Sequence, residues 1–293
     1  MLEPEFKAVL KPTIFREYIN GSLDDYPAGM INDNMKEFHF ILGFATDTYV
    51  NGKGTGVFTR TWNFKSLGPE KVLKLIVEHR NVKVVISIGG HGAEDVFNPK
   101  NRDIWIANAK SSIKDLILDY KIDVGSGGIS TTYGIDINYE NIDSSVDDFA
   151  YCIGNVIQQL KEDEDLSYSM SAVSIAPTEA LQSYYLTLYL KNKDKIDWIN
   201  YKFYKQSFDS VIEFVKLFKK LVYEYGAPFK LLAGVSTDTI TSSSYTMTTE
   251  FFVKGCTILL NTASLAGVFV WDANSSAPTY LLEEQIQKLF TKK

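Results

Sequence analysis

The chain has 293 residues, of which 45% are hydrophobic and 23% are charged, so it is long enough to bury a core without disulfides or metals. Its net charge of −6 argues against nucleic acids and anionic membranes as partners. No apolar stretch reaches the ~20 residues that span a bilayer. The two cysteines lie far apart, and the histidines and cysteines show no metal-binding spacing. We therefore expect no disulfide, no metal and no other cofactor.

The amino-terminal residues lack a basic region followed by an apolar stretch, which is the pattern of a secretory signal. A cytoplasmic protein is expected on that basis, whereas a chain that is a trimmed mature form would be secreted.

Eight apolar segments recur along the chain and predict strands. Several are continuously apolar rather than alternating, which is typical of strands that are covered on both faces. Their ranges are 13–15, 37–44, 83–88, 134–140, 169–175, 197–204, 230–235 and 267–271.

Amphipathic segments with a helical period lie between these strands. One begins at Gly68-Pro69-Glu70, where a proline in the first turn is followed by an acid, as at many helix starts. The predicted helices cover 68–80, 104–120, 149–160, 211–226, 251–260 and 279–290. Eight strands interleaved with helices predict a single (β/α)8 TIM barrel domain over residues 1–293, and a doubly wound open sheet is the alternative.

The segment 133–140 (YGIDINYE) alternates strictly between apolar and polar residues after its first two positions. Asp136, Asn138 and Glu140 therefore share one face of a strand. If the strand belongs to a closed barrel, this row lines the interior and Glu140 lies at the carboxyl-end mouth, where such barrels carry their active sites. The other interpretation is an edge strand whose polar face is solvated.

This segment resembles the DGxDxDxE signature of glycoside hydrolase family 18, the chitinases. Ser87-Ile88-Gly89-Gly90 resembles the SxGG motif of that family. Trp271 stands where the family keeps a tryptophan beneath the bound sugar, and Phe203-Tyr204 stands where plant chitinases carry a tyrosine that touches the substrate acetamide. The resemblance covers essentially the whole chain and implies the barrel fold.

A narrower resemblance is to the narbonin-like branch of this family, which has no known hydrolase activity and to which the RuBisCO-associated protein is related. It rests on residues 14–18 (IFREY), 41–45 (ILGFA) and 84–90 (VVISIGG).

The resemblance implies a substrate-assisted reaction, in which Glu140 would protonate the glycosidic oxygen and a carboxylate two residues before it would hold the acetamide. Asp136 and Glu140 are present, but Asn138 occupies the position of that carboxylate and Tyr133 replaces the first acid of the signature. An amide carries no charge and shares no proton with Glu140, so the motif is a remnant. The loss of one such electrostatic partner typically costs ~2.7–4 kcal/mol of barrier.

Two cations are expected near this remnant. Lys202 stands where plant chitinases have glutamine before Phe203-Tyr204, and His91 follows the glycines of the SxGG-like motif. We expect Glu140 to be ion-paired at the mouth, with Lys202 as the first candidate partner and His91 as the second, which would lower its pKa. Arg16 and Glu17, at the end of the first predicted strand, either also fill the floor of the barrel or form an exposed or locally satisfied pair.

Three functions follow from this interpretation. The preferred one is a chitinase-like protein that has lost hydrolase activity, with the storage or developmental role that the narbonin-like resemblance implies. The second is a lectin-like binder of N-acetylglucosamine oligosaccharides that uses Trp271, Tyr204 and Phe44. The third is a weak chitinase that uses Glu140 with Asp136. We expect a monomer in each case.

Overall fold

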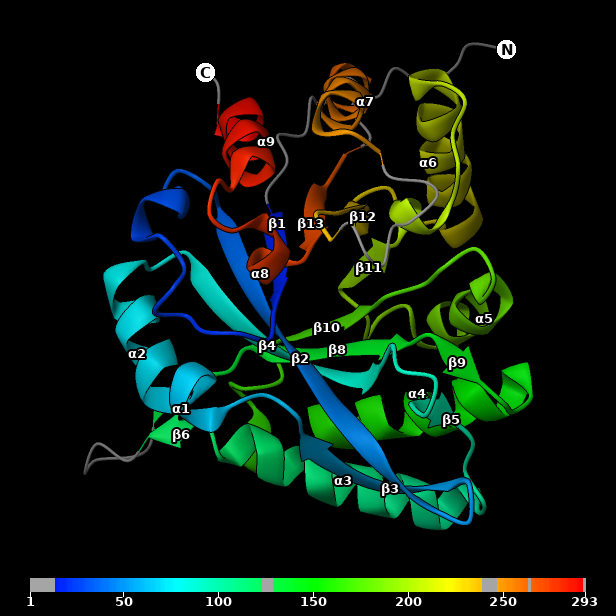
Figure 1. The fold of residues 1–293 in the computed structure, drawn as a ribbon. Coiled ribbons are helices and arrows are strands. Elements are labelled where there is room, and N and C mark those ends of the chain that lie inside the picture. The colour runs from blue at the N-terminus through cyan, green and yellow to red at the C-terminus, as the bar shows by residue number, and fades with distance from the viewer. Residues whose placement is uncertain (1–13, 123–128, 239–246, 263–264, 292–293) are drawn as a thin grey trace.

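The apolar segments form eight parallel strands that close into a barrel (Figure 1). In this computed structural model, the described residues are 14–122, 129–238, 247–262 and 265–291. Closure is direct, because β1 pairs in parallel with β13 on one side and with β2 on the other. The barrel strands are β1 (Ile14–Ile19), β2 (Glu37–Val50), β4 (Val82–Gly90), β8 (Gly134–Tyr139), β10 (Ala172–Ile175), β11 (Trp198–Tyr201), β12 (Leu231–Ser236) and β13 (Gly267–Trp271). The predicted (β/α)8 barrel is confirmed, and the doubly wound open sheet is wrong.

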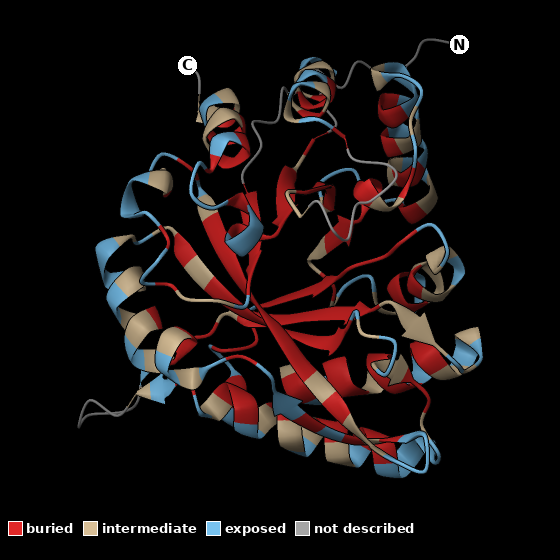
Figure 2. Cartoon of the chain, in the orientation of Figure 1, coloured by how far each residue is buried: buried red, intermediate tan, exposed pale blue. Residues whose placement is uncertain are grey.

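Helices surround the barrel and turn their apolar faces toward it, so buried residues concentrate in the strands and on the inner helix faces (Figure 2). They are α1 (Phe64–Leu67), α2 (Pro69–Glu78), α3 (Arg102–Leu118), α4 (Val146–Lys161), α5 (Gln182–Asn192), α6 (Val211–Tyr225), α7 (Thr249–Asn261), α8 (Ala273–Ser276) and α9 (Leu281–Thr291). Within the described ranges, no helix combines the length and the hydropathy needed to cross a bilayer.

Local signals explain several helix ends. Ser145 precedes α4 and its side chain accepts a hydrogen bond from the Asp148 amide, and Ser210 caps α6 in the same way through Glu213. Gly226 ends α6 in the left-handed conformation, with φ at 61°.

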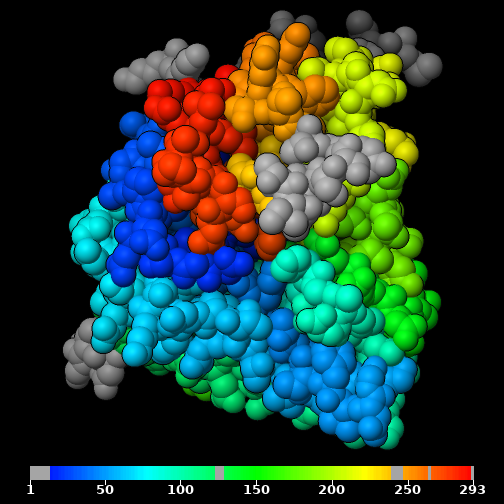
Figure 3. All heavy atoms as spheres, viewed as in Figure 1, coloured from blue at the N-terminus to red at the C-terminus, as the bar shows by residue number. Residues whose placement is uncertain are grey.

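The two ends of the described chain meet on the barrel wall. Helix α9 packs beside the segment that follows β1, where the red and blue surfaces adjoin in Figure 3. Gln287 donates a hydrogen bond of 2.7 Å to the carbonyl of Met30 and accepts one of 3.0 Å from the Asn32 amide. These contacts fasten the last helix to the first strand's loop.

Several element boundaries differ from the prediction. Strand β1 extends to Ile19, and β2 continues to Val50 and folds back through an antiparallel partner, β3 (Lys53–Arg60), that the sequence did not predict. Strand β11 ends at Tyr201, so the following residues lie in a short 3₁₀ turn, η3 (Phe203–Lys205). Further short elements are β5 (Val96–Phe97), β6 (Lys121–Ile122), β7 (Ile129–Ser130), β9 (Asn141–Ile142), η1 (Ala28–Met30) and η2 (Glu164–Leu166).

Candidate functional site at the barrel mouth

Strand β8 carries Asp136 into the centre of the barrel, where its carboxylate accepts four hydrogen bonds. The donors are the Tyr18 hydroxyl at 2.8 Å, the Ser87 hydroxyl at 2.8 Å, the Ser174 hydroxyl at 2.6 Å and the Asn200 amide at 3.0 Å. All five residues are buried. Because the donors come from β1, β4, β10 and β11, this carboxylate ties opposite walls of the barrel together.

Arg16 lies in the barrel interior beside Asp136 and its four donors, and it is fully buried. Its Nη1 donates to the side-chain oxygen of Asn200 at 3.0 Å, so the amide of Asn200 bridges the guanidinium to Asp136. Burial lowers the pKa of Arg16, and the Asp136 charge is the largest influence that opposes this. Glu17 points away from the interior and accepts a 2.8 Å hydrogen bond from Tyr26.

Glu140 immediately follows β8 and lies between two ammonium groups. Lys202 Nζ is 2.6 Å from one carboxylate oxygen of Glu140, and Lys205 Nζ is 3.1 Å from the other. Lys202 also donates to the side-chain oxygen of Asn138 at 2.5 Å. The Lys202 side chain is 1% exposed and that of Glu140 is 17% exposed, so water screens this pair poorly.

The charges of this cluster determine the protonation state of Glu140. Burial by itself would raise the pKa of the carboxyl, but Lys202 and then Lys205 outweigh it and lower the pKa to about 2. Burial also lowers the pKa of Lys202, which Glu140 partly counteracts. Near neutral pH Glu140 is therefore a carboxylate, whereas a general acid must hold a proton at the working pH.

Aromatic side chains fill the mouth beside this cluster. Trp271 stacks on Phe44, with ring centroids 5.6 Å apart and an interplanar angle of 20°, and Tyr18 packs 5.2 Å from Trp271. Trp271 is 7% exposed. The small recess that these residues line, at Tyr18, Gly43 and Trp271, has no room for a water molecule. Phe44 thus covers one face of the Trp271 ring.

His91 and Tyr204 belong to the same aromatic region. The His91 ring lies 5.3 Å from Trp271 and 5.6 Å from Phe44, and no ion pair joins it to Glu140 among the described residues. Tyr204 is buried, packs 6.2 Å from Phe269, and has its pKa raised well above 10 by burial. The structure therefore places Lys205 at the position against Glu140 for which the sequence suggested His91.

The glycine motif at the end of β4 allows this arrangement. Gly89 has φ at +114°, and a Cβ there would lie 2.4 Å from the carbonyl oxygen of Asn138. A side chain at this position would therefore push β8 away from β4. The glycine allows β4 to approach closely the strand that carries Asn138 and precedes Glu140.

Several residues of the site were not singled out by the sequence. Lys205 was visible as the second lysine of the run Lys202-Phe203-Tyr204-Lys205, but its direction depends on the turn η3. Tyr18, Ser174 and Asn200 carry no local signal, because their role depends only on which strands face one another. Across the described ranges, no cluster of three histidine, cysteine or acidic residues could hold a metal ion.

Comparison with known proteins shows that nearly the whole chain is similar to chitinases. The chain is 36% identical over 274 residues to Chitinase 1 of Tulipa saxatilis subsp. bakeri, which covers 90% of this chain and 81% of that protein. It is 27% identical over 168 residues to the RuBisCO-associated protein of Glycine max, which covers 55% of each chain. The catalytic domain of a family 18 chitinase from the fern Peteris ryukyuensis superposes with a TM-score of 0.80 at 32% identity and covers 95% of this chain and all of that one. No family model matches the chain.

Proposed function

The chain belongs to the family 18 chitinases, and we propose that it is a member of that family that does not hydrolyse chitin. The observation that carries this proposal is the position of Lys202, whose ammonium contacts both Glu140 and Asn138. The residue that would donate a proton is held as an anion, and the residue that would hold the acetamide is a neutral amide already engaged by a cation.

Each defect affects a different part of the reaction. Holding Glu140 as a carboxylate removes the proton that the departing sugar oxygen must receive. The amide of Asn138 supplies no negative charge for the positive ring that forms when the acetamide attacks, and such a preorganised charge typically contributes ~2.7–4 kcal/mol to catalysis. The packing of Phe44 against Trp271 further opposes sugar binding at the centre of the mouth.

One experiment separates this function from the two others that the sequence suggests. The wild-type protein is titrated with the tetramer of N-acetylglucosamine by calorimetry, and hydrolysis is followed in parallel by chromatography. We expect neither heat nor cleavage. Heat without cleavage would instead support the lectin-like binder, and slow cleavage would support a weak chitinase that uses Glu140.

A set of variants tests the reason for inactivity. Asn138→Asp alone restores the missing charge but leaves Lys202 against Glu140, so we expect no turnover. The triple variant Asn138→Asp/Lys202→Gln/Lys205→Gln removes both cations as well, and we expect detectable hydrolysis. Robust turnover by Asn138→Asp alone would show that the ion pair is irrelevant to the loss of activity.

A storage role is the specific form of this proposal that the narbonin-like resemblance suggests. It requires neither ligand binding nor catalysis at the barrel mouth. It predicts that the protein accumulates in a storage tissue and is degraded when that tissue is mobilised. Quantitative immunoblotting through development measures this, and a constant low abundance would contradict it.

A further inference from the structure

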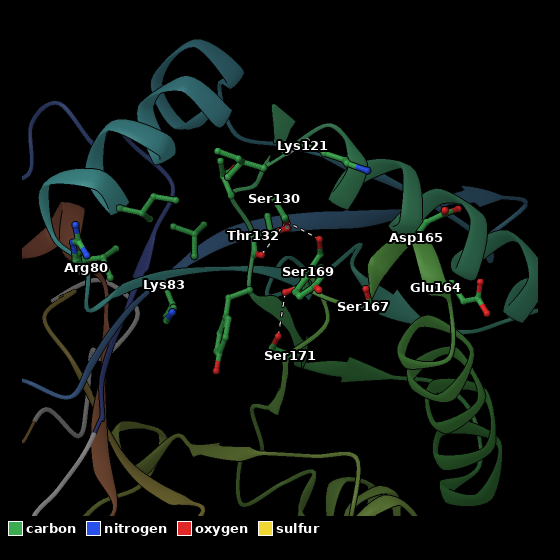
Figure 4. A pocket seen from close by; sticks show the side chains of 17 residues that line it. Arg80, Lys83, Lys121, Ser130, Thr132, Glu164, Asp165, Ser167, Ser169 and Ser171 are labelled. Atoms are coloured by element: carbon green, nitrogen blue, oxygen red, sulfur yellow. Dashed lines mark hydrogen bonds between the residues drawn. The ribbon is translucent and has the colours of Figure 1, made fainter. Parts of the chain in front are cut away.

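A cavity lined by described residues lies at the opposite end of the barrel from Glu140. It has a volume of about 940 Å³ and opens at the amino-terminal ends of β4, β8 and β10 (Figure 4). This volume is in the range of clefts that hold small molecules, roughly 300–1,000 Å³. From the charges and hydroxyls that line it, we propose that this cavity binds the phosphate monoester of a sugar-sized polyol.

One side of the cavity is cationic. Arg80 and Lys83 lie on the same side in the close view (Figure 4), and neither has an ion-pair or hydrogen-bond partner for its side chain among the residues that the structure describes. Lys83 is half-buried, and its ammonium lies 4.9 Å from the centre of the Tyr133 ring. The ring attracts this ammonium without neutralising it, and the Glu37 carboxylate, which also contacts His39, is near enough for Lys83 to help lower its pKa.

The middle of the cavity is rich in hydroxyl groups. Ser130 and Ser169 are hydrogen-bonded to each other at 2.6 Å, and Ser130 also contacts the carbonyl of Thr132 at 3.1 Å. The two serines come from separate segments and meet at the centre of the view (Figure 4). Ser130 donates its single proton to the Thr132 carbonyl, so Ser169 donates to Ser130, and the pair keeps lone pairs that can accept hydrogen bonds from the hydroxyls of a ligand.

The far side of the cavity carries two carboxylates together with Lys121. Glu164 and Asp165 lie opposite Arg80 and Lys83 (Figure 4), and Lys114 pairs with Asp165 at 2.6 Å. A second phosphate would meet the Glu164 carboxylate there, and like charges repel. A single phosphate at Arg80 and Lys83, with a neutral polyol reaching across the serines, fits this arrangement of charge.

Calorimetry with glucose 6-phosphate as the probe tests the site. Wild-type protein is titrated at low salt with glucose 6-phosphate, with inorganic phosphate and with glucose. We expect glucose 6-phosphate to bind more tightly than inorganic phosphate or glucose, because the phosphate and the hydroxyls would contact different sides of the cavity. No binding of glucose 6-phosphate, or equal affinity for inorganic phosphate, would overturn the proposal.

Variants then locate the binding. Arg80→Gln and Lys83→Met should each weaken glucose 6-phosphate binding by about tenfold, the usual effect of losing one charge-assisted hydrogen bond. Lys74→Gln is the matched control, because Lys74 is an exposed cation of α2 that does not line the cavity. Arg80 is exposed, so its variant keeps the test valid if Lys83→Met folds poorly. Unchanged affinity in Arg80→Gln and Lys83→Met, or an equal loss in Lys74→Gln, would place the probe elsewhere and overturn the assignment.

Discussion

Lys202 contacts Glu140 at 2.6 Å from a position 62 residues further along the chain, and it does so from within the barrel. Lysine is rarely buried unless it is paired, and here the pair is completed by the one motif residue that a chitinase would use as an acid. The same contact thus stabilises the cation and lowers the pKa of the carboxyl, so one interaction both stabilises the barrel mouth and holds Glu140 as an anion.

Replacing Lys202 should destabilise the fold far more than replacing Lys205. Lys202→Gln removes the partner of a largely buried carboxylate, and we expect it to lower the free energy of unfolding by about 3 kcal/mol. Lys205 is 30% exposed, so water compensates for its loss and Lys205→Gln should cost no more than about 1 kcal/mol. Urea unfolding at neutral pH measures both, and equal effects would contradict the dominant role of Lys202.

The Glu140 pair should also contribute an acid-sensitive part of the stability. The pKa of Glu140 is about 2 in the folded chain against an ordinary value of 4.5, so the unfolded chain binds more protons between these values. The contribution, about 3 kcal/mol, is complete above pH 4.5 and is lost as the pH falls toward 2.

The measurement is the difference in unfolding free energy between the wild type and Glu140→Gln, taken at several pH values from 6 to 3. This difference should stay constant at the higher pH values and shrink as the pH falls below about 4.5. A difference that stays constant over this range would mean that Glu140 titrates alike in the folded and unfolded chains.

The negative charge of Asp136, and not only its ability to accept hydrogen bonds, should stabilise the folded barrel. Asp136→Asn keeps the shape but leaves the buried Arg16 without the nearby anion that opposes its desolvation. We expect a loss of about 3–5 kcal/mol. The matched control is Ser174→Ala, which removes one of the four donors to Asp136 and should cost about 1 kcal/mol. Urea unfolding compares them, and a loss for Asp136→Asn as small as that for Ser174→Ala would contradict this role.

Glu17 should make the protein less stable as the pH rises. It is fully buried beside Glu283, and burial followed by the Glu283 charge raises the pKa of Glu17 well above 4.5. The folded chain therefore holds a proton that the unfolded chain releases, so the stability from this pair is complete below pH 4.5 and falls as the pH rises through the raised pKa. Glu17→Gln needs no such proton. Its unfolding free energy minus that of the wild type should therefore be larger at pH 8 than at pH 5.

Chemical denaturation of both proteins at pH 5 and 8 gives this difference. Glu70→Gln, at a site in the first turn of α2 remote from the pair, serves as the control and should track the wild type. If the gain of Glu17→Gln were the same at both pH values, the carboxyl pair would not be the source of the pH dependence.

Much of the barrel was predictable because its signals are local. The alternation over 134–140 assigned Asp136, Asn138 and Glu140 to one face of a strand, and the apolar runs located all eight barrel strands. The hairpin of β2 and β3 was not predicted, because Gly52 and Gly54 interrupt the apolar pattern and β3 gains its order by packing on α3 through contacts such as Asn108 to the Thr55 carbonyl at 2.7 Å.

The sequence by itself determined which side chains of β8 face inward, because side-chain direction in a strand follows from the two-residue repeat of the backbone. It also placed Lys202 near the end of the predicted strand 197–204 and an asparagine where a chitinase carries an acid. Only the tertiary structure decided which groups those residues meet: Lys205 and not His91 against Glu140, and Tyr18, Ser174 and Asn200 around Asp136. Those contacts join strands that are distant along the chain, so they depend on barrel closure and strand register.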